Sequence, residues 1–152
     1  MIRPATPQDF EAIKSLETQV SQMHTTALPH IFKPIDFTQE SYQERLDNEL
    51  SRIFVYETQD EILAYYDASF WDYYQDPMFK DMMILGINSV CVAEKAQGKG
   101  IGKALFNHAK ALAREIGAQR IELLVWKFNQ NAMEFYQHLG MDTKYVRLEI
   151  EV

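Results

Sequence analysis

A glycine-rich stretch at residues 97–103, Gln97-Gly98-Lys99-Gly100-Ile101-Gly102-Lys103, is where residue types and spacing most directly suggest chemistry. It holds three of the six glycines in the 152 residues, although glycine weakens helices and strands unless its backbone freedom is needed. A strand-like apolar run precedes the stretch, and a helical pattern follows it. Such a turn points free backbone N–H groups and the positive end of the helix dipole at one place, which favours an anion. Taken alone, the G-x-G spacing is equally typical of a plain turn.

Other nucleotide-binding patterns and metal patterns are absent from the sequence. There is no G-x-x-x-x-G-K-[ST] loop, and no acidic residue follows a GxGxxG at the spacing of a dinucleotide-binding fold. The four histidines lack HxxxH or HExxH spacing, so we expect no metal site. The single cysteine, Cys91, cannot form an intrachain disulfide and lies in the apolar run 90–92, where a buried and unreactive thiol is expected.

The composition is that of an acidic globular chain. The hydrophobic fraction is 47%, yet no apolar run approaches the roughly 20 residues that span a bilayer, so a membrane protein is not expected. The first residues carry no apolar signal core, and we expect a cytoplasmic location. A net charge of −7 argues against a nucleic-acid surface, which needs a basic face. The acidity suits a cationic small molecule or a peptide amine instead.

The hydrophobic pattern predicts one domain, residues 1–152, without linkers or repeats. Expected strands lie at residues 2–5, 52–57, 62–70 and 83–92. Expected helices begin after Thr6 and after Thr38, separated by an irregular segment at residues 25–37, and a third helix covers residues 103–116. Phe10, Ile13, Leu16, Val20 and Met23 recur at helical spacing in the first helix and should face the core.

Two motifs, in the right order, resemble the GNAT (GCN5-related) family of N-acetyltransferases. Gln97, Gly100 and Gly102 match the R/Q-x-x-G-x-G/A loop with which that family binds the pyrophosphate of acetyl-CoA. Residues 129–141 are similar to the family's N-x-x-A-x-x-x-Y-x-x-x-G-F/M signature, and residues 87–92 and 121–126 look like its fourth and fifth strands. The resemblance spans roughly residues 84–145. The start, IRPATPQD, is a weaker match, and residues 21–83, where acceptor specificity would be set, match nothing specific.

The resemblance implies an α+β, three-layer fold with a mixed, mostly antiparallel sheet flanked by helices. Strands four and five would be parallel and splayed apart, with helix 103–116 as the crossover between them. The cofactor implied is acetyl-CoA, with no metal. The residues that match its binding positions are Val90, Cys91, Val92, Gln97, Gly98, Lys99, Gly100, Ile101, Gly102, Lys103, Asn129 and Tyr136. The strand residues would bind the pantetheine arm through their backbones, so their apolar side chains fit a plain core strand equally well.

The same resemblance assigns catalytic roles. Tyr136 matches the tyrosine that protonates the departing thiolate, although it also fits an aromatic residue on the inner face of helix 129–139. Asn129 matches a cofactor-contacting asparagine and would equally serve as a helix N-cap. A backbone N–H among residues 90–92 would stabilise the oxyanion.

The general base is not assigned by the resemblance. Related sequences often carry a carboxylate at the positions of Asn88 or Leu124, and this chain has none there. An ordinary ammonium must lose a proton before it attacks. The candidates are a water held by Asn88 and Ser89, or the carboxylate of Asp67 on the preceding strand, which would otherwise face solvent.

The function implied is acetyl transfer to a primary amine by direct attack in a ternary complex, without an acetylated cysteine. A small-molecule amine is favoured over a peptide amine, and a non-catalytic acyl-CoA sensor stays open because the usual carboxylates are missing. The aromatic and acidic segment 65–79 suits a cationic acceptor, but a hairpin with its rings packed inward explains it equally well. The run 145–152 is a candidate strand for pairing two chains in a homodimer.

Overall fold

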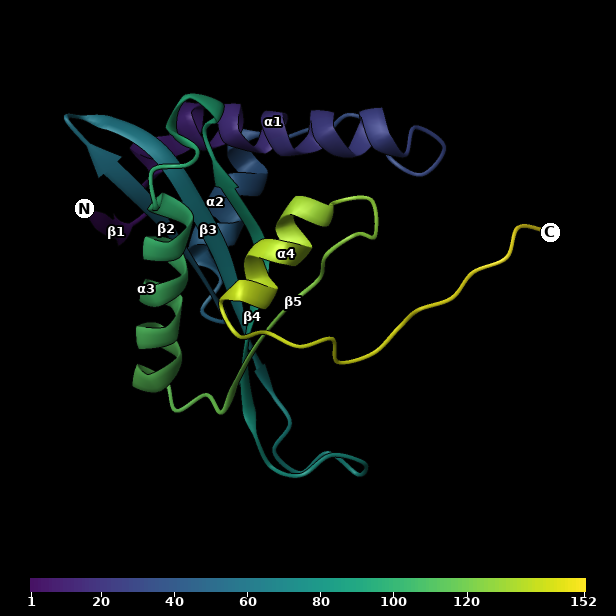
Figure 1. Cartoon of the computed structure of the whole chain (residues 1–152). Coiled ribbons are helices and arrows are strands. Elements are labelled where there is room, and N and C mark those ends of the chain that lie inside the picture. The colour runs from purple at the N-terminus through teal and green to yellow at the C-terminus, as the bar shows by residue number, and fades with distance from the viewer.

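The computed structural model describes all of residues 1–152 and has a five-stranded sheet as its middle layer (Figure 1). The strands follow one another in the order of the sequence: β1 (Ile2–Pro4), β2 (Ser51–Thr58), β3 (Glu61–Asp72), β4 (Met83–Val92) and β5 (Arg120–Leu123). Neighbouring strands are antiparallel except for β4 and β5, which are parallel. The predicted α+β fold with a mixed, mostly antiparallel sheet is therefore confirmed.

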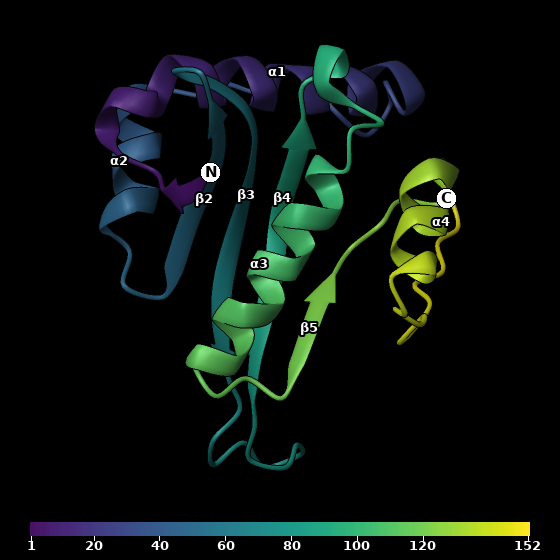
Figure 2. The same ribbon diagram turned by 60° about the vertical axis from the view of Figure 1, so that its left-hand side comes forward.

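Helices cover both faces of this sheet (Figure 2). They are η1 (Pro7–Asp9), α1 (Phe10–Ala27), α2 (Gln39–Asp47), η2 (Glu94–Ala96), α3 (Ile101–Glu115) and α4 (Gln130–His138). The helices α1 and α2 pack on one face, and α3 packs on the other as the crossover between β4 and β5. No helix is long and apolar enough to cross a membrane.

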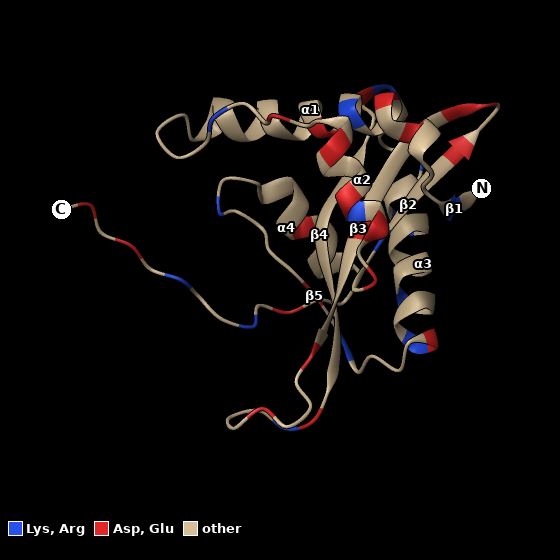
Figure 3. Cartoon of the chain, turned by 180° about the vertical axis from the view of Figure 1, so that it is seen from behind, with Lys and Arg blue, Asp and Glu red and all other residues tan.

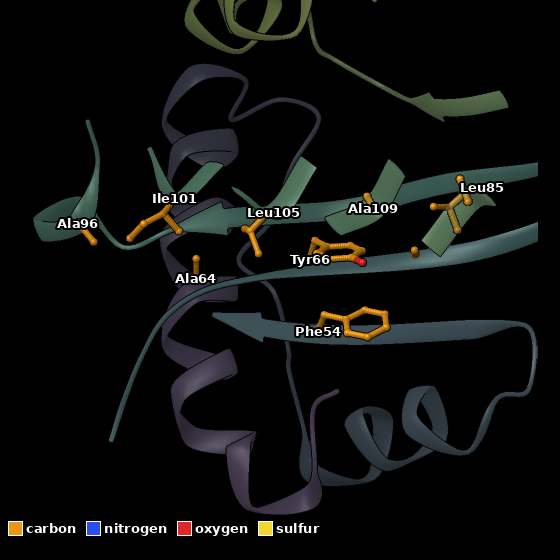
Figure 4. Packing of buried hydrophobic residues seen from close by; sticks show 10 residues of the cluster. Phe54, Ala64, Tyr66, Leu85, Ala96, Ile101, Leu105 and Ala109 are labelled. Carbon is orange, nitrogen blue, oxygen red and sulfur yellow. The ribbon is translucent and has the colours of Figure 1, made fainter. Parts of the chain in front are cut away.

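The face under α3 is built from alternate residues of the strands, which point to the same side of a pleated sheet. Tyr66 and Leu85 meet Leu105 and Ala109 of α3, and small alanines on both elements let the helix approach closely (Figure 4). Tyr66 also places its hydroxyl 2.7 Å from Nδ1 of His108. Burial lowers the pKa of His108, so the imidazole is neutral at pH 7 and fits this apolar layer.

The opposite face packs against α1 and α2 through the other set of strand residues, including Val55, Tyr65 and Cys91. Ile13, Leu16 and Tyr42 supply the helical side of this layer. Cys91 is only 6% exposed, and burial raises the pKa of its thiol to about 12. The expected buried thiol is thus confirmed, and it is protonated at neutral pH.

Several element boundaries differ from the expected ones. Helix α1 continues through Ala27, and its last turns extend past the sheet, so Met23 is 41% exposed instead of facing the core. Helix α3 begins at Ile101, two residues earlier than predicted. Strand β5 ends at Leu123, because residues 124–126 have no partner strand in the chain. Residues 145–152 also lack a partner strand and form no strand. The proposal that residues 145–152 pair two chains stays a prediction, because the structure holds a single chain.

Candidate active site

The site begins where β4 and β5 part. Their pairing runs from Ile84–Arg120 to Ile87–Leu123 and stops there, whereas β4 continues to Val92 with β3 as its only neighbour. The edge of β4 from residue 88 to residue 92 consequently faces an opening between the two strands (Figure 2). The predicted splay of strands four and five is present, and Val90, Cys91 and Val92 lie on its open edge.

Asn88 occupies the fork of this opening. The register of β3 and β4 passes from the pair Asp67–Ser89 to the pair Ala68–Ile87, so Asn88 is the extra residue of a β-bulge. Its exposed side chain donates from Nδ2 to Ser69 Oγ at 2.6 Å and reaches Asp67 Oδ1 at 3.4 Å. The bulge therefore brings together two of the predicted site residues, Asn88 and Asp67.

Asp67 does not face solvent as an alternating strand residue would, because it is 4% exposed and paired with Arg45 of α2. Arg45 Nε donates to Asp67 Oδ2 at 3.0 Å, and Arg45 Nη1 donates to Glu17 Oε1 of α1 at 3.0 Å. Figure 3 shows how the acidic and basic residues are distributed along the chain. Burial alone would lower the pKa of Arg45, but the two carboxylates outweigh it and raise that pKa. The guanidinium of Arg45 thus pairs with two buried carboxylates. It does not contact Asp67 Oδ1, which accepts the bond from Asn88.

The glycine loop forms an open cradle at the start of α3. Gly98 and Gly100 have φ values of 74° and 80°, a region that other residues rarely adopt, and a Cβ at either would meet nothing within 4 Å. None of the backbone N–H groups from Gly98 to Lys103 donates to an acceptor in the chain. Lys99 and Lys103 are exposed and form no ion pair. This donor set fits a bound pyrophosphate.

Gln97 sits beside the cradle with its side chain turned toward β4. Its Nε2 donates to the carbonyl oxygen of Val92 at 3.2 Å, and Nε2 of Gln19 in α1 donates to the same oxygen at 3.0 Å. Gln19 also accepts a bond from the backbone N–H of Glu94 at 3.3 Å. Gln97 therefore holds the loop against the end of β4, and Gln19 attaches α1 there, a contact that no motif indicated.

Tyr136 of α4 lies across the opening on the α3 side. It lines an apolar hollow with Val90 of β4, Leu123 of β5 and Phe106 of α3. The hydroxyl of Tyr136 makes no hydrogen bond within the chain, and burial raises its pKa to about 12, so it is a free proton donor at neutral pH. The neighbouring Phe135 ring would lie 3.1 Å from a Cβ on Gly102, so this glycine allows α4 to approach α3.

Asn129 serves as the N-cap of α4, because its Oδ1 accepts a bond from the backbone N–H of Ala132 at 3.1 Å. It borders a cavity of about 320 Å³ between the end of α1 and the connection from β5 to α4. Aromatic rings bridge the same gap. The ring centroids of His24 and Phe32 are 4.8 Å apart, and those of Phe32 and Trp126 are 5.0 Å apart. Sequence reasoning missed this cluster, since no spacing links His24 and Phe32 to Trp126, which lies in the run that resembles strand five. Helix α1 thus spans from the end of β4 to the far side of the opening.

The aromatic and acidic segment divides between two places. Residues 65–72 belong to β3, whereas residues 73–82 form a loop at the end of β4 opposite the cradle (Figure 1). Exposed Tyr74, Met78 and Phe79 therefore lie far from the opening. No group of three or more His, Cys, Asp or Glu side chains could hold a metal ion.

A model of the acetyltransferase (GNAT) family matches residues 16–141, and the chain belongs to this family. It is 40% identical over 60 residues to an N-acetyltransferase of Methanocaldococcus jannaschii, a match that covers 40% of this chain and 26% of that protein. The chain therefore spans about a quarter of that curated relative.

Solved structures match over the whole chain. A mutant of the BH1408 protein from Bacillus halodurans has a TM-score of 0.95 at 28% identity, covering 100% of this chain and 99% of that one. The aminoglycoside N-acetyltransferase AAC(6')-Iy in complex with CoA has a TM-score of 0.75 at 14% identity, covering 100% of this chain and 99% of that one. At that identity the likeness concerns the fold alone.

Proposed function

We propose that residues 1–152 act as one cytoplasmic N-acetyltransferase that uses acetyl-CoA and acetylates a primary amine by direct attack in a ternary complex. The observation that carries the proposal is the row of unpaired backbone N–H groups from Gly98 to Lys103, beside the open edge of β4. The family membership supports it, and AAC(6')-Iy, which shares the fold, was solved with CoA.

The chain's own residues fit the two ends of this cofactor. Gly98 and Gly100 leave room for a pyrophosphate, and Lys99 and Lys103 add positive charge to an acidic protein. The backbone of residues 90–92 would pair with the pantetheine arm as an added strand, and one of its N–H groups would stabilise the oxyanion. When bound, acetyl-CoA supplies an activated thioester carbonyl.

The proton steps are assigned to two groups on different elements. Tyr136 would donate its phenolic proton to the departing sulfur, since its hydroxyl is unbonded and its pKa is about 12. Asn88 would position the attacking amine, directly or through a water, and Asp67 behind it would accept the proton. Cys91 plays no nucleophilic part, because burial raises the pKa of its thiol to about 12.

A small-molecule amine is the favoured acceptor. The aromatic bridge from His24 through Phe32 to Trp126 narrows the opening on the α1 side, which leaves less room for a folded protein than for a small cation. A peptide amine is the second candidate acceptor. The alternative in which the protein is not an enzyme is a non-catalytic acyl-CoA sensor. Only the lack of a carboxylate at positions 88 and 124, which are Asn88 and Leu124, favours it. We also propose that the protein acts as a homodimer.

The first test is calorimetric titration of acetyl-CoA into the native chain and into Gly100→Asp. The aspartate would place bulk and negative charge in the cradle, so we expect micromolar binding to be lost. Gly117→Asp is the matched control, because Gly117 has a φ of 74° and equally open surroundings at the other end of α3. The cofactor assignment would be overturned if Gly100→Asp still bound acetyl-CoA, or if the native chain did not bind it. Native binding then justifies screening amines for CoA release.

A further inference from the structure

We infer that the amine bound at this site is a primary monoamine on an uncharged aromatic body, and that this body packs against four rings beside the opening between β4 and β5. These rings, which we call the aromatic cluster, are His24, Phe32, Trp126 and Phe128. The inference rests on the proposed function in one respect, because it takes this amine as the acetyl acceptor. It excludes polyamines and aminoglycosides as good ligands.

The aromatic cluster lies outside the core. Each of its rings is half-buried, and none belongs to the two buried layers on the faces of the sheet. His24 meets Phe128 edge-on, and Phe32 meets Trp126 edge-on, so ring faces remain on which no other ring of the cluster is stacked. Phe128 also borders the cavity of about 320 Å³, which is large enough for a small ligand. A further ring can therefore pack at this place.

The walls of this end of the opening carry no negative charge. Residues 23–34 and 123–133 contain none of the 22 Asp and Glu residues of a protein whose net charge is −7. They do contain Lys33 and Lys127, which are exposed and form no ion pair. A ligand with several ammonium groups would meet repulsion here and find no counter-charge.

The fork of β4 and β5 offers a counter-charge for a single ammonium. Asp67 and Glu17 carry two negative charges between them, and Arg45, which donates to both, balances one of these charges. The remaining negative charge faces the opening through Asn88, whose side chain contacts Asp67 Oδ1. This balance fits one ammonium and is too small for a polycation.

The distance from the fork to the aromatic cluster fits a short linker. The pairing of β5 with β4 ends at Leu123, and Trp126 follows three residues later, so the two are separated by at most roughly 11 Å of extended chain. On the other wall, Gln19 of α1 contacts Val92 at the end of β4, and His24 follows within two turns of the same helix. A phenyl ring joined to its amine by a short alkyl chain spans most of this distance.

Calorimetric titration of amines into the native chain, with and without CoA, tests the inference apart from acetyl transfer. The probes are phenethylamine, spermidine and kanamycin. We expect phenethylamine to bind at least about tenfold more tightly than either polycation, because the burial and packing of one ring are worth that much. A smaller preference, a preference for a polycation, or no binding of any amine would overturn the inference. If the expected preference occurs in a chain that releases no CoA from acetyl-CoA, the binding preference is supported and acetyl transfer is the part that fails.

A variant of the aromatic cluster gives a second measurement. Phe32→Leu keeps an apolar side chain but removes the central ring, so it should weaken phenethylamine binding about fivefold to tenfold while the acetyl-CoA affinity stays within about twofold. Phe79→Leu is the matched control, because Phe79 also forms an edge-on pair at 5.0 Å, with Tyr73, in the loop at the opposite end of β4. It should change neither affinity. Unchanged phenethylamine binding in Phe32→Leu, or an equal loss in Phe79→Leu, would contradict the placement of the ligand ring.

Discussion

Asp67 and Glu17 have similar surroundings in the structure, but they differ in the residues that they contact. Both are buried carboxylates that accept from Arg45, so each balances the same cation. Only Asp67 also contacts Asn88, the bulged residue at the fork of β4 and β5. Removing either charge disturbs the pair, which costs stability because a buried charge loses its partner. If Asp67 transfers a proton, its substitution should therefore affect activity differently from that of Glu17. If both residues are purely structural, the two substitutions should have similar effects.

We expect Asp67→Asn to lower kcat/KM for an amine by roughly 10²-fold at pH 7, the typical contribution of a positioned base. The deficit should shrink as pH rises toward the amine's own pKa of about 10, since the free amine then needs no base. Glu17→Gln removes the same charge from Arg45 and should keep the native pH profile. Equal losses in both variants, independent of pH, would show that Asp67 is structural.

Tyr136 gives a separate residue-scale prediction. Because its pKa is about 12, the phenol keeps its proton throughout the neutral range, so loss of this donor should not limit the native rate below about pH 10. Tyr136→Phe should reduce turnover roughly 10²-fold while acetyl-CoA affinity, measured by calorimetry, stays within about twofold. Unchanged turnover would remove Tyr136 from the mechanism, and a native chain that binds acetyl-CoA without acetylating any amine would favour the sensor.

At the scale of elements, β4 has two functions along its length. Its first half pairs with both β3 and β5, and its second half has no neighbour on the β5 side. The ring of Trp71 of β3 covers Gly86 in the first half of β4. A Cβ added to Gly86 would lie only 2.3 Å from this ring. Glycine at this position lets an aromatic ring cover the strand just below the fork.

Gly86→Ala should therefore displace Trp71 and lower the free energy of unfolding by about 1 kcal/mol, the low end for overpacking, since the ring is 37% exposed and can move. Urea unfolding measures the change. In a Trp71→Ala background the same substitution should cost nothing, because the clash is gone. A loss of equal size in both backgrounds would mean that the alanine strains the backbone and does not meet the ring.

At the scale of the whole molecule, Arg3 ties the start of the chain to the sheet. It donates from Nη1 and Nη2 to Asp9 at 2.8 Å and 3.0 Å, and from Nε to Glu57 of β2 at 2.8 Å. Burial alone would raise the pKa of Asp9, but the bonds from Arg3 and Thr6 outweigh it and lower that pKa. The hydrogen bond from Arg3 likewise lowers the pKa of Glu57.

Because the pKa of Asp9 is depressed by folding, its contribution to stability is present above the unfolded value of about 3.9 and is lost as pH falls through the lower, folded value. Asp9→Asn should thus destabilise the protein at pH 7, and the difference from the native chain should diminish below about pH 4. Thermal unfolding from pH 7 to pH 2 measures it. Glu44→Gln, on the exposed face of α2 and outside any ion pair, should show no such trend.

The sequence by itself determined the parts whose chemistry is local. Turn glycines, helical spacing after residue 101 and alternation in β2 and β3 depend on nearest neighbours, so the strand–loop–helix cradle and the two strands β2 and β3 were predictable. The GNAT motifs at residues 97–102 and 129–141 placed Tyr136 and Asn129 on the correct helix.

Only the tertiary structure decided which distant groups meet. Arg45 and Glu17 reach Asp67 from two helices in the segment without a motif, and a β-bulge turns Asn88 toward the same carboxylate. Nothing in the spacing of these residues encodes that meeting, because burial and long-range packing bring them together. The ends of strands depend on partners in the same way: residues 124–126 and 145–152 carry a strand pattern but have no neighbour within one chain, so the pattern alone could not make them strands.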